Sequence, residues 1–203
     1  MAVICRCPRN CARLPTKVSP DFLFSGEGPQ DWLMQYFPVA ETGIAATPIC
    51  QYMNPDCLLL AGVSGFDDRE RLNQILLHRY VIQYEPFYYK GHLRDFPLTL
   101  AYGQQIDALR RKYKAYLWDG RFRDALGADV SADGSHRHSV FVAADGKRAV
   151  VVINQELGKA ITAKVSLPNA SELIVATPER PDGEPTTGAL QIPARSATVV
   201  IER

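Results

Sequence analysis

Acidic side chains stand where short apolar runs of the sequence end. Glu27 lies in a Gly/Pro turn after the first such run. Asp67 and Asp68 follow a second run at 58–63, and Glu85 lies in an aromatic turn. Carboxyl groups held in turns at strand ends can give and take protons on a bound substrate. The sequence therefore predicts general acid–base chemistry at these four residues.

Each of these carboxylates also has a structural interpretation. Glu27 could bind an arginine or backbone amides in its loop. Capping of a helix N-terminus explains at least one of Asp67 and Asp68, because a carboxylate there accepts hydrogen bonds from free backbone N–H groups. A salt bridge to a nearby arginine explains Glu85 about as well as catalysis does.

Alternating strand and helix patterns must position these residues. The runs 22–27 and 58–63 predict buried strands. Apolar residues at spacings of three and four predict an amphipathic helix over 69–83. Asp95 before Phe96 and Pro97 predicts the N-cap of a second helix that reaches about Trp118. This order of elements favours an α/β unit.

The second predicted helix divides into an apolar and a basic face. The apolar stripe comprises Leu98, Tyr102, Ile106, Leu109, Tyr113 and Tyr116. The basic residues Arg110, Arg111, Lys112 and Lys114 are expected on its solvated face.

The pattern changes period after Gly120. Six short runs rich in β-branched residues follow, at 139–143, 148–154, 161–167, 173–176, 190–192 and 197–201. Turn signals such as Asp145-Gly146 separate them. Regularly spaced short strands of this kind predict an antiparallel β-sandwich.

Several spaced motifs together resemble a known family. They are Phe24–Trp32, Gly65–Glu70, Tyr84–Phe87, Asp95–Gly103 and Tyr116–Asp119. Over about residues 19–203 the chain resembles the C-terminal part of bacterial barrel-type glycoside hydrolases, in which the last barrel repeats lead into a β-sandwich. The resemblance implies an α/β fold class with a partial, incomplete TIM-barrel-like unit over 19–120 and an antiparallel β-sandwich over 121–203. Residues 1–18 show no resemblance and are expected to be a disordered or unrelated basic segment.

The length of the chain agrees with only part of such an enzyme. A complete eight-stranded barrel takes about 250 residues, and this chain has 203. The family's earlier barrel strands are absent here. A half barrel leaves sheet edges unpaired, and we expect a homo-oligomer to cover them.

The resemblance implies hydrolysis of a glycosidic bond by two carboxyl groups. Glu27 would be the acid/base, and one of Glu85, Asp67 and Asp68 the nucleophile or its equivalent. The expected substrate is a small glycoside with a terminal sugar such as galactose or glucose, as in galactosidases and glucosidases. The alternative is a non-catalytic carbohydrate-binding or structural remnant of a larger glycosidase.

Aromatic rings near the carboxylates suit a carbohydrate substrate, because sugars lay their apolar C–H faces on such rings. The candidates are Trp32, Tyr36, Phe66, Phe87, Tyr88 and Tyr89. Packing in a core is the alternative. It is weaker for 87–89, because three consecutive rings cannot all face one core. Of the 19 aromatic residues, 17 lie between Phe22 and Trp118, so we expect the sugar site in that segment.

Composition and motifs exclude several other classes of function. The formal net charge of +1 argues against a nucleic-acid or membrane-surface partner. The five cysteines are an odd number and a poor disulfide framework, and the histidines show no metal spacing. We therefore expect no metal. No phosphate-binding glycine loop is present, and we expect no cofactor. No secretory leader is recognisable, and a cytoplasmic protein is expected.

Overall fold

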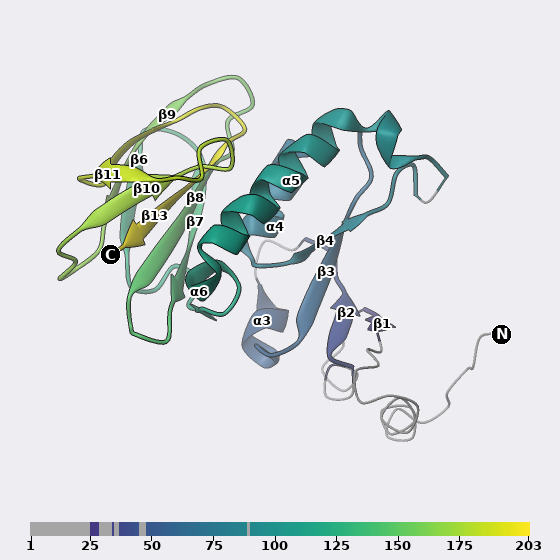
Figure 1. The fold of residues 1–203 in the computed structure, drawn as a ribbon, viewed down its shortest axis with the longest axis horizontal. Helices are drawn as coiled ribbons and strands as arrows, with labels where there is room; N and C mark the ends of the chain where they lie inside the picture. The colour runs from purple at the N-terminus through teal and green to yellow at the C-terminus, as the bar shows by residue number, and fades with distance from the viewer. Residues whose placement is uncertain (1–24, 29–33, 35–36, 45–47, 89) are drawn as a thin grey trace. The chain divides into compact units, whose positions relative to one another are not determined.

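The computed structural model describes residues 25–28, 34, 37–44, 48–88 and 90–203 (Figure 1). The chain forms two compact units, residues 1–62 and 63–203, and each is described by itself. The expected segment 1–18 lies outside the described residues, and the expected boundary at 120/121 stays a prediction.

The first unit contains a parallel sheet. Its strands are β1 (Ser25–Glu27), β2 (Val39–Glu41) and β3 (Leu58–Val63), whose last residue already belongs to the second unit. The short helix α3 (Ile49–Met53) precedes β3. Leu59 and the last three residues of β3, Ala61, Gly62 and Val63, are buried, as for a strand covered on both faces at its end. The predicted strand at 58–63 is therefore confirmed, and the parallel pairing agrees with the α/β part of the expected fold class. The incomplete barrel itself stays a prediction.

The second unit begins with a helical layer and one short strand. The elements are α4 (Arg69–Leu77), β4 (Val81–Tyr84), the 3₁₀ turn η1 (Leu93–Asp95), α5 (Pro97–Lys112) and α6 (Lys114–Leu117). Helices α4 and α5 lie side by side (Figure 1).

The predicted helix over 69–83 is wrong in its second half. Helix α4 ends at Leu77, and Arg79 takes the left-handed conformation with φ 56°. The Tyr80 amide then donates to the Ile75 carbonyl at 2.9 Å, which closes the turn. The β-branched residues Val81 and Ile82 follow in β4.

The start of α5 also differs from the prediction. Pro97 occupies the first turn as expected, but Phe96 is the N-cap residue and its side chain makes no capping hydrogen bond. The Asp95 carboxylate instead accepts a hydrogen bond from the His92 amide at 3.3 Å, one turn earlier. Leu98, expected on the apolar stripe, is 63% exposed.

The remaining strands form two antiparallel sheets. In chain order they are β5 (Arg121–Phe122), β6 (Asp129–Ala132), β7 (His136–Val142), β8 (Arg148–Asn154), β9 (Ile161–Ser166), β10 (Leu173–Ala176), β11 (Glu184–Thr186), β12 (Ala189–Ile192) and β13 (Ala197–Glu202). One sheet has the order β11-β10-β13-β8-β7-β5 and the other β12-β9-β6. All six predicted strands are present.

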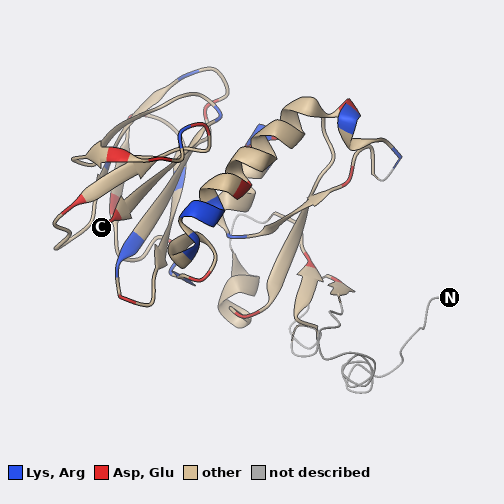
Figure 2. Ribbon diagram, in the orientation of Figure 1, with Lys and Arg blue, Asp and Glu red and all other residues tan. Residues whose placement is uncertain are grey.

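Both sheets contribute to one apolar core. Val150 and Val152 of β8, with Val140 and Val200 of its neighbouring strands, pack in the same cluster as Ile161 and Val165 of β9. Strand β9 alternates strictly between buried and exposed residues, as a strand with one solvated face should. Two sheets closing on a common core make the predicted β-sandwich. Figure 2 shows acidic and basic residues interspersed along this unit.

Candidate functional site

Glu85 directly follows β4 and is held at the end of that strand. Its backbone amide donates to the Val63 carbonyl at 2.8 Å, which places it beside the end of β3. The residue is only 9% exposed, and its Oε1 is buried without a hydrogen-bond partner among the described residues. A buried carboxylate oxygen left unbonded costs free energy, so it marks a place where a ligand would complete the hydrogen bonding.

Packing beneath α5 fixes the strand that carries Glu85. A Cβ atom on Gly103 of α5 would lie 2.1 Å from the hydroxyl oxygen of Tyr84, so only glycine leaves room for that ring. Burial raises the pKa of Tyr84, with a smaller contribution from Asp107. The phenol is therefore neutral at physiological pH and serves to anchor β4.

The turn after Glu85 has a strained backbone. Phe87 and Tyr88 have φ values of 48° and 52°, in the left-handed region that aromatic residues rarely adopt. The Gly91 amide donates to the Pro86 carbonyl at 3.0 Å and closes the turn. A Cβ on Gly91 would lie 2.8 Å from the Phe87 ring. Strain of about 1–3 kcal/mol for each such residue is typical of ligand-binding and active-site segments.

Three rings pack on one another beside this turn. Phe66 lies 5.2 Å from Phe87 and 4.8 Å from Phe96, and Phe87 lies 4.9 Å from Phe96, all between ring centroids. Phe96 is buried beneath the other two. Phe66 remains 59% exposed, Phe87 47% and the adjacent Tyr88 76%. The structure therefore brings three of the predicted ring residues together with Glu85 as an exposed apolar surface.

The two aspartates before α4 are occupied by other contacts. Asp68 is the N-cap residue of α4, and its carboxylate accepts hydrogen bonds from the amides of Ser64 at 2.7 Å and Gly65 at 2.6 Å. Asp67 forms an ion pair with Arg195 at 2.8 Å. Both aspartates therefore have structural contacts, but the expected capping is not among them: the Asp68 side chain makes no capping hydrogen bond to α4, and Asp67 binds Arg195.

Glu70 and Asp67 share the guanidinium of Arg195. The hydrogen bond from Arg195 is the largest cause of the lowered pKa of Glu70, and these two carboxylates in turn raise the pKa of Arg195. Arg195 lies in the loop before β13, whereas Asp67 and Glu70 begin α4. The ion pairs of Arg195 with Asp67 and Glu70 therefore connect the sandwich to the helical layer of the same unit.

The first unit holds a different pair of carboxylates. Glu27 is the last residue of β1 and lies in register with Glu41, the last residue of the parallel strand β2. Residues in register on adjacent parallel strands point to the same face of a sheet. Glu41 was missed in the sequence, although it repeats the signal of Glu27: a short apolar stretch, a carboxylate and a glycine two residues later at Gly43.

Three further predicted site residues, Trp32, Tyr36 and Tyr89, fall outside the described residues. No group of three His, Cys, Asp or Glu side chains in the described ranges is arranged to hold a metal ion. None of the helices described is both long and apolar enough to cross a membrane.

Comparisons with known proteins concern the fold of the chain. No protein-family model and no curated protein sequence matches the chain. Among solved structures, it is similar to a maltogenic α-amylase from Thermotoga neapolitana, with a TM-score of 0.61 and 10% identity over 96% of this chain and 57% of that one. It is also similar to a GH27 β-L-arabinopyranosidase from Geobacillus stearothermophilus, with a TM-score of 0.54 and 7% identity over 97% of this chain and 53% of that one.

A variant of the same arabinopyranosidase, in complex with arabinose, gives a TM-score of 0.51 at 8% identity over 89% of this chain and 50% of that one. The chain thus spans 50–57% of the length of these structures. At this level of identity the similarity concerns the fold alone. The chain has a glycosidase-like fold over little more than half the length of such an enzyme.

Proposed function

We propose that this protein is a glycoside hydrolase that removes a terminal sugar from small glycosides, of the galactosidase or glucosidase type. The observation that carries the proposal is Glu85: a carboxylate at a strand end, 9% exposed, with one oxygen unbonded and exposed aromatic rings next to it. The glycosidase-like fold supports the same class of substrate.

Hydrolysis of a glycoside needs two carboxyl groups, one that protonates the leaving oxygen and one that attacks the anomeric carbon or activates water. Glu27 keeps the acid/base role that its place at a strand end predicts. Glu85 takes the second role in preference to Asp67 and Asp68, because those two already bind Arg195 and backbone amides. Water completes the reaction by adding its hydroxyl to the sugar and its proton to the departing alcohol.

The rings beside Glu85 supply the surface for the sugar. Phe66 and Phe87 present exposed edges and faces while Phe96 supports them from below. A pyranose laid on this surface would bury its C–H face and leave its hydroxyls toward polar groups. Trp32, Tyr36, Tyr88 and Tyr89 remain further candidates for contacts with the sugar.

The test is hydrolysis of a panel of nitrophenyl α- and β-galactosides, glucosides and arabinopyranosides. Glu85→Gln and Glu27→Gln should each lower kcat/KM by about 10²- to 10⁴-fold, as removal of a proton-transfer group does. Glu41→Gln tests the neighbour of Glu27. Glu172→Gln, at an exposed residue of the sandwich, is the matched control and should retain activity. Activity that neither Glu85→Gln nor Glu27→Gln reduces would exclude the assigned pair.

A second function is favoured by the exposed rings beside Glu85. Such a surface can bind carbohydrate without cleaving it. In that case the folded protein would hydrolyse no glycoside of the panel, but the sugars would still bind. Equilibrium dialysis with radiolabelled galactose and glucose separates this function from hydrolysis.

A further inference from the structure

The sandwich contains a hollow built from elements other than the Glu85 turn. The loop between β10 and β11 forms one side, and β12 and β13 form the other, around a cavity of about 380 Å³. This volume lies within the range of about 300–1,000 Å³ that is usual for sites of small molecules. All of its lining residues belong to the second unit.

The lining combines an apolar base with neutral polar groups. Partly buried Val175 supplies aliphatic surface where the cavity meets the sandwich core, in which Leu190 is buried, while Thr177, Thr198 and Gln191 supply two hydroxyls and an amide. Hydroxyl and amide groups both donate and accept hydrogen bonds. Such a set suits a ligand that carries many hydroxyls around an aliphatic ring.

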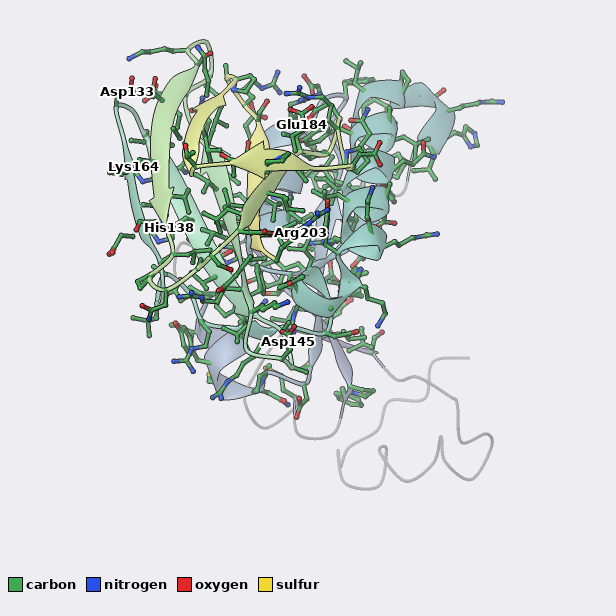
Figure 3. All side chains as sticks on the ribbon, turned by 60° about the vertical axis from the view of Figure 1, so that its left-hand side comes forward. Asp133, His138, Asp145, Lys164, Glu184 and Arg203 are labelled. Atoms are coloured by element: carbon green, nitrogen blue, oxygen red, sulfur yellow. The ribbon has the colours of Figure 1, made fainter. Side chains whose placement is uncertain are left out.

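The charged side chains that line the cavity form ion pairs. Glu179 pairs with Arg69 of α4 at 2.8 Å, and Asp182 pairs with Lys112 of α5. Arg180 lies 3.8 Å from Glu184, which extends from β11 (Figure 3). Because each charge is compensated, the cavity offers no strong field of one sign to an ionic ligand. A neutral ligand is favoured over a phosphate or a cation.

Contacts fix the loop that forms the wall. Thr177 and Arg180 exchange two backbone hydrogen bonds of 3.1 Å each across the turn. Gly183 has φ 76°, and a Cβ there would lie 2.6 Å from the hydroxyl oxygen of Tyr113. With ion pairs to α4 and α5 on either side, the wall is ordered before any ligand arrives. A wall that is already ordered lowers the entropic cost of binding.

We infer that this cavity is a second binding site for a neutral saccharide, formed entirely by the C-terminal part of the chain. Its sugar would place the C–H face of the ring against the partly buried Val175. The hydroxyls would bond to Gln191, Thr198 and the guanidinium of Arg180. No carboxylate of the proposed catalytic set takes part, so binding here does not depend on hydrolysis.

Two-dimensional ¹H–¹⁵N NMR of the full chain tests the inference. Titration with glucose, galactose and maltose should shift the amide signals of Thr177, Gly183 and Gln191 for at least one sugar. Using Glu85→Gln protein prevents turnover and separates this site from the proposed active site. Arg180→Ala and Gln191→Ala each change an exposed side chain. Each should lower the affinity for that sugar at least fivefold. Gln155→Ala, another exposed amide of the sandwich, should leave its affinity unchanged.

Three results would overturn the inference. The first is that none of the three sugars shifts these amide signals. The second is that Arg180→Ala and Gln191→Ala leave the shifts as they were. The third is that sodium phosphate alone shifts the same signals at lower concentration than any sugar. Loss of hydrolysis in Glu85→Gln with the cavity shifts intact would leave the inference standing and concern only the proposed function.

Discussion

His78 is a buried imidazole whose surroundings disfavour its charged form. It is 1% exposed, and its Nε2 lies 3.3 Å from a guanidinium nitrogen of Arg137. Burial, together with the charge of Arg137, lowers the pKa of His78 from 6.5 to about 4. In the unfolded chain this residue takes up its proton near pH 6.5. The folded protein therefore binds fewer protons than the unfolded chain between these two values.

Stability should consequently fall as the pH is lowered through this window. We expect His78 to remove up to about 3 kcal/mol of the free energy of unfolding between pH 6.5 and 4, at 1.36 kcal/mol per pKa unit. Urea denaturation across this range measures the slope. His78→Gln should flatten it, and His92→Gln, at an exposed histidine, should not. Equal slopes in the wild type and His78→Gln would contradict the expectation.

The sequence predicted the burial and contacts of some residues but not of others. The prediction that the rings at 87–89 do not all face a core agrees with the exposure of Phe87 and Tyr88, while Tyr89 lies outside the described residues. Arg110 was expected on the solvated face but is fully buried. Helical spacing alone could not reveal this, because the reason lies in two carbonyl groups of another helix and its following turn. Of the four predicted carboxylates, sequence alone could not separate Glu85 from Asp67, since Arg195, which binds Asp67, lies far away in the chain.

Two neighbouring helices are joined through this arginine. The guanidinium of Arg110 in α5 donates to the Ile75 carbonyl of α4 at 2.6 Å and to the Tyr80 carbonyl at 2.8 Å. Its Cζ also lies 4.6 Å from the centre of the Trp118 ring. Arg110 thereby adds a second hydrogen bond to the Ile75 carbonyl, which already accepts the Tyr80 amide, and binds the Tyr80 carbonyl in the turn after α4. Burial lowers its pKa to about 10, which still leaves it charged at neutral pH.

Arg110→Met should therefore destabilise the second unit. The substitution keeps an aliphatic stem but removes one hydrogen bond from the Tyr80 carbonyl and one from the Ile75 carbonyl, which still accepts the Tyr80 amide; we expect a loss of about 2 kcal/mol in the free energy of unfolding. Arg111→Met, at the exposed neighbouring position, is the matched control and should change it little. Chemical denaturation of the two variants measures the difference. Equal stabilities would show that α4 does not depend on this contact.

Strands were predicted correctly where their buried residues form an apolar run in the sequence. Runs such as 148–154 are apolar because both faces of β8 are covered. Strand β6 was missed because its residues, Asp129–Ala132, are only half-buried or exposed and form no apolar run. Strand β11 contains Pro185 and lies at the outside of its sheet, where a missing N–H is tolerated. The division of 69–83 into helix and strand depended on the left-handed turn at Arg79, which no periodic pattern encodes.

The whole molecule has a strand edge that needs a partner. Strand β1 lies at the outside of the parallel sheet, as far as the described residues extend. Open edges of this kind pair with other strands. We expect size-exclusion chromatography with light scattering to give a mass well above the 22.6 kDa of one chain, and a dilution series to lower it. A monomer at every concentration would contradict edge pairing between copies.

Three hydrogen bonds join the sandwich to its helical layer. Ser139 of β7 donates to the Leu77 carbonyl at 2.6 Å, Tyr116 donates to Glu202 at 2.8 Å, and Asn73 donates to Arg195 at 2.9 Å. A boundary placed after Gly120 would sever all three hydrogen bonds and separate Asp67 and Glu70 from Arg195. One after Gly62 would sever none of them. The sandwich strands therefore depend on the helical layer for these contacts, and residues 121–203 by themselves would lack them.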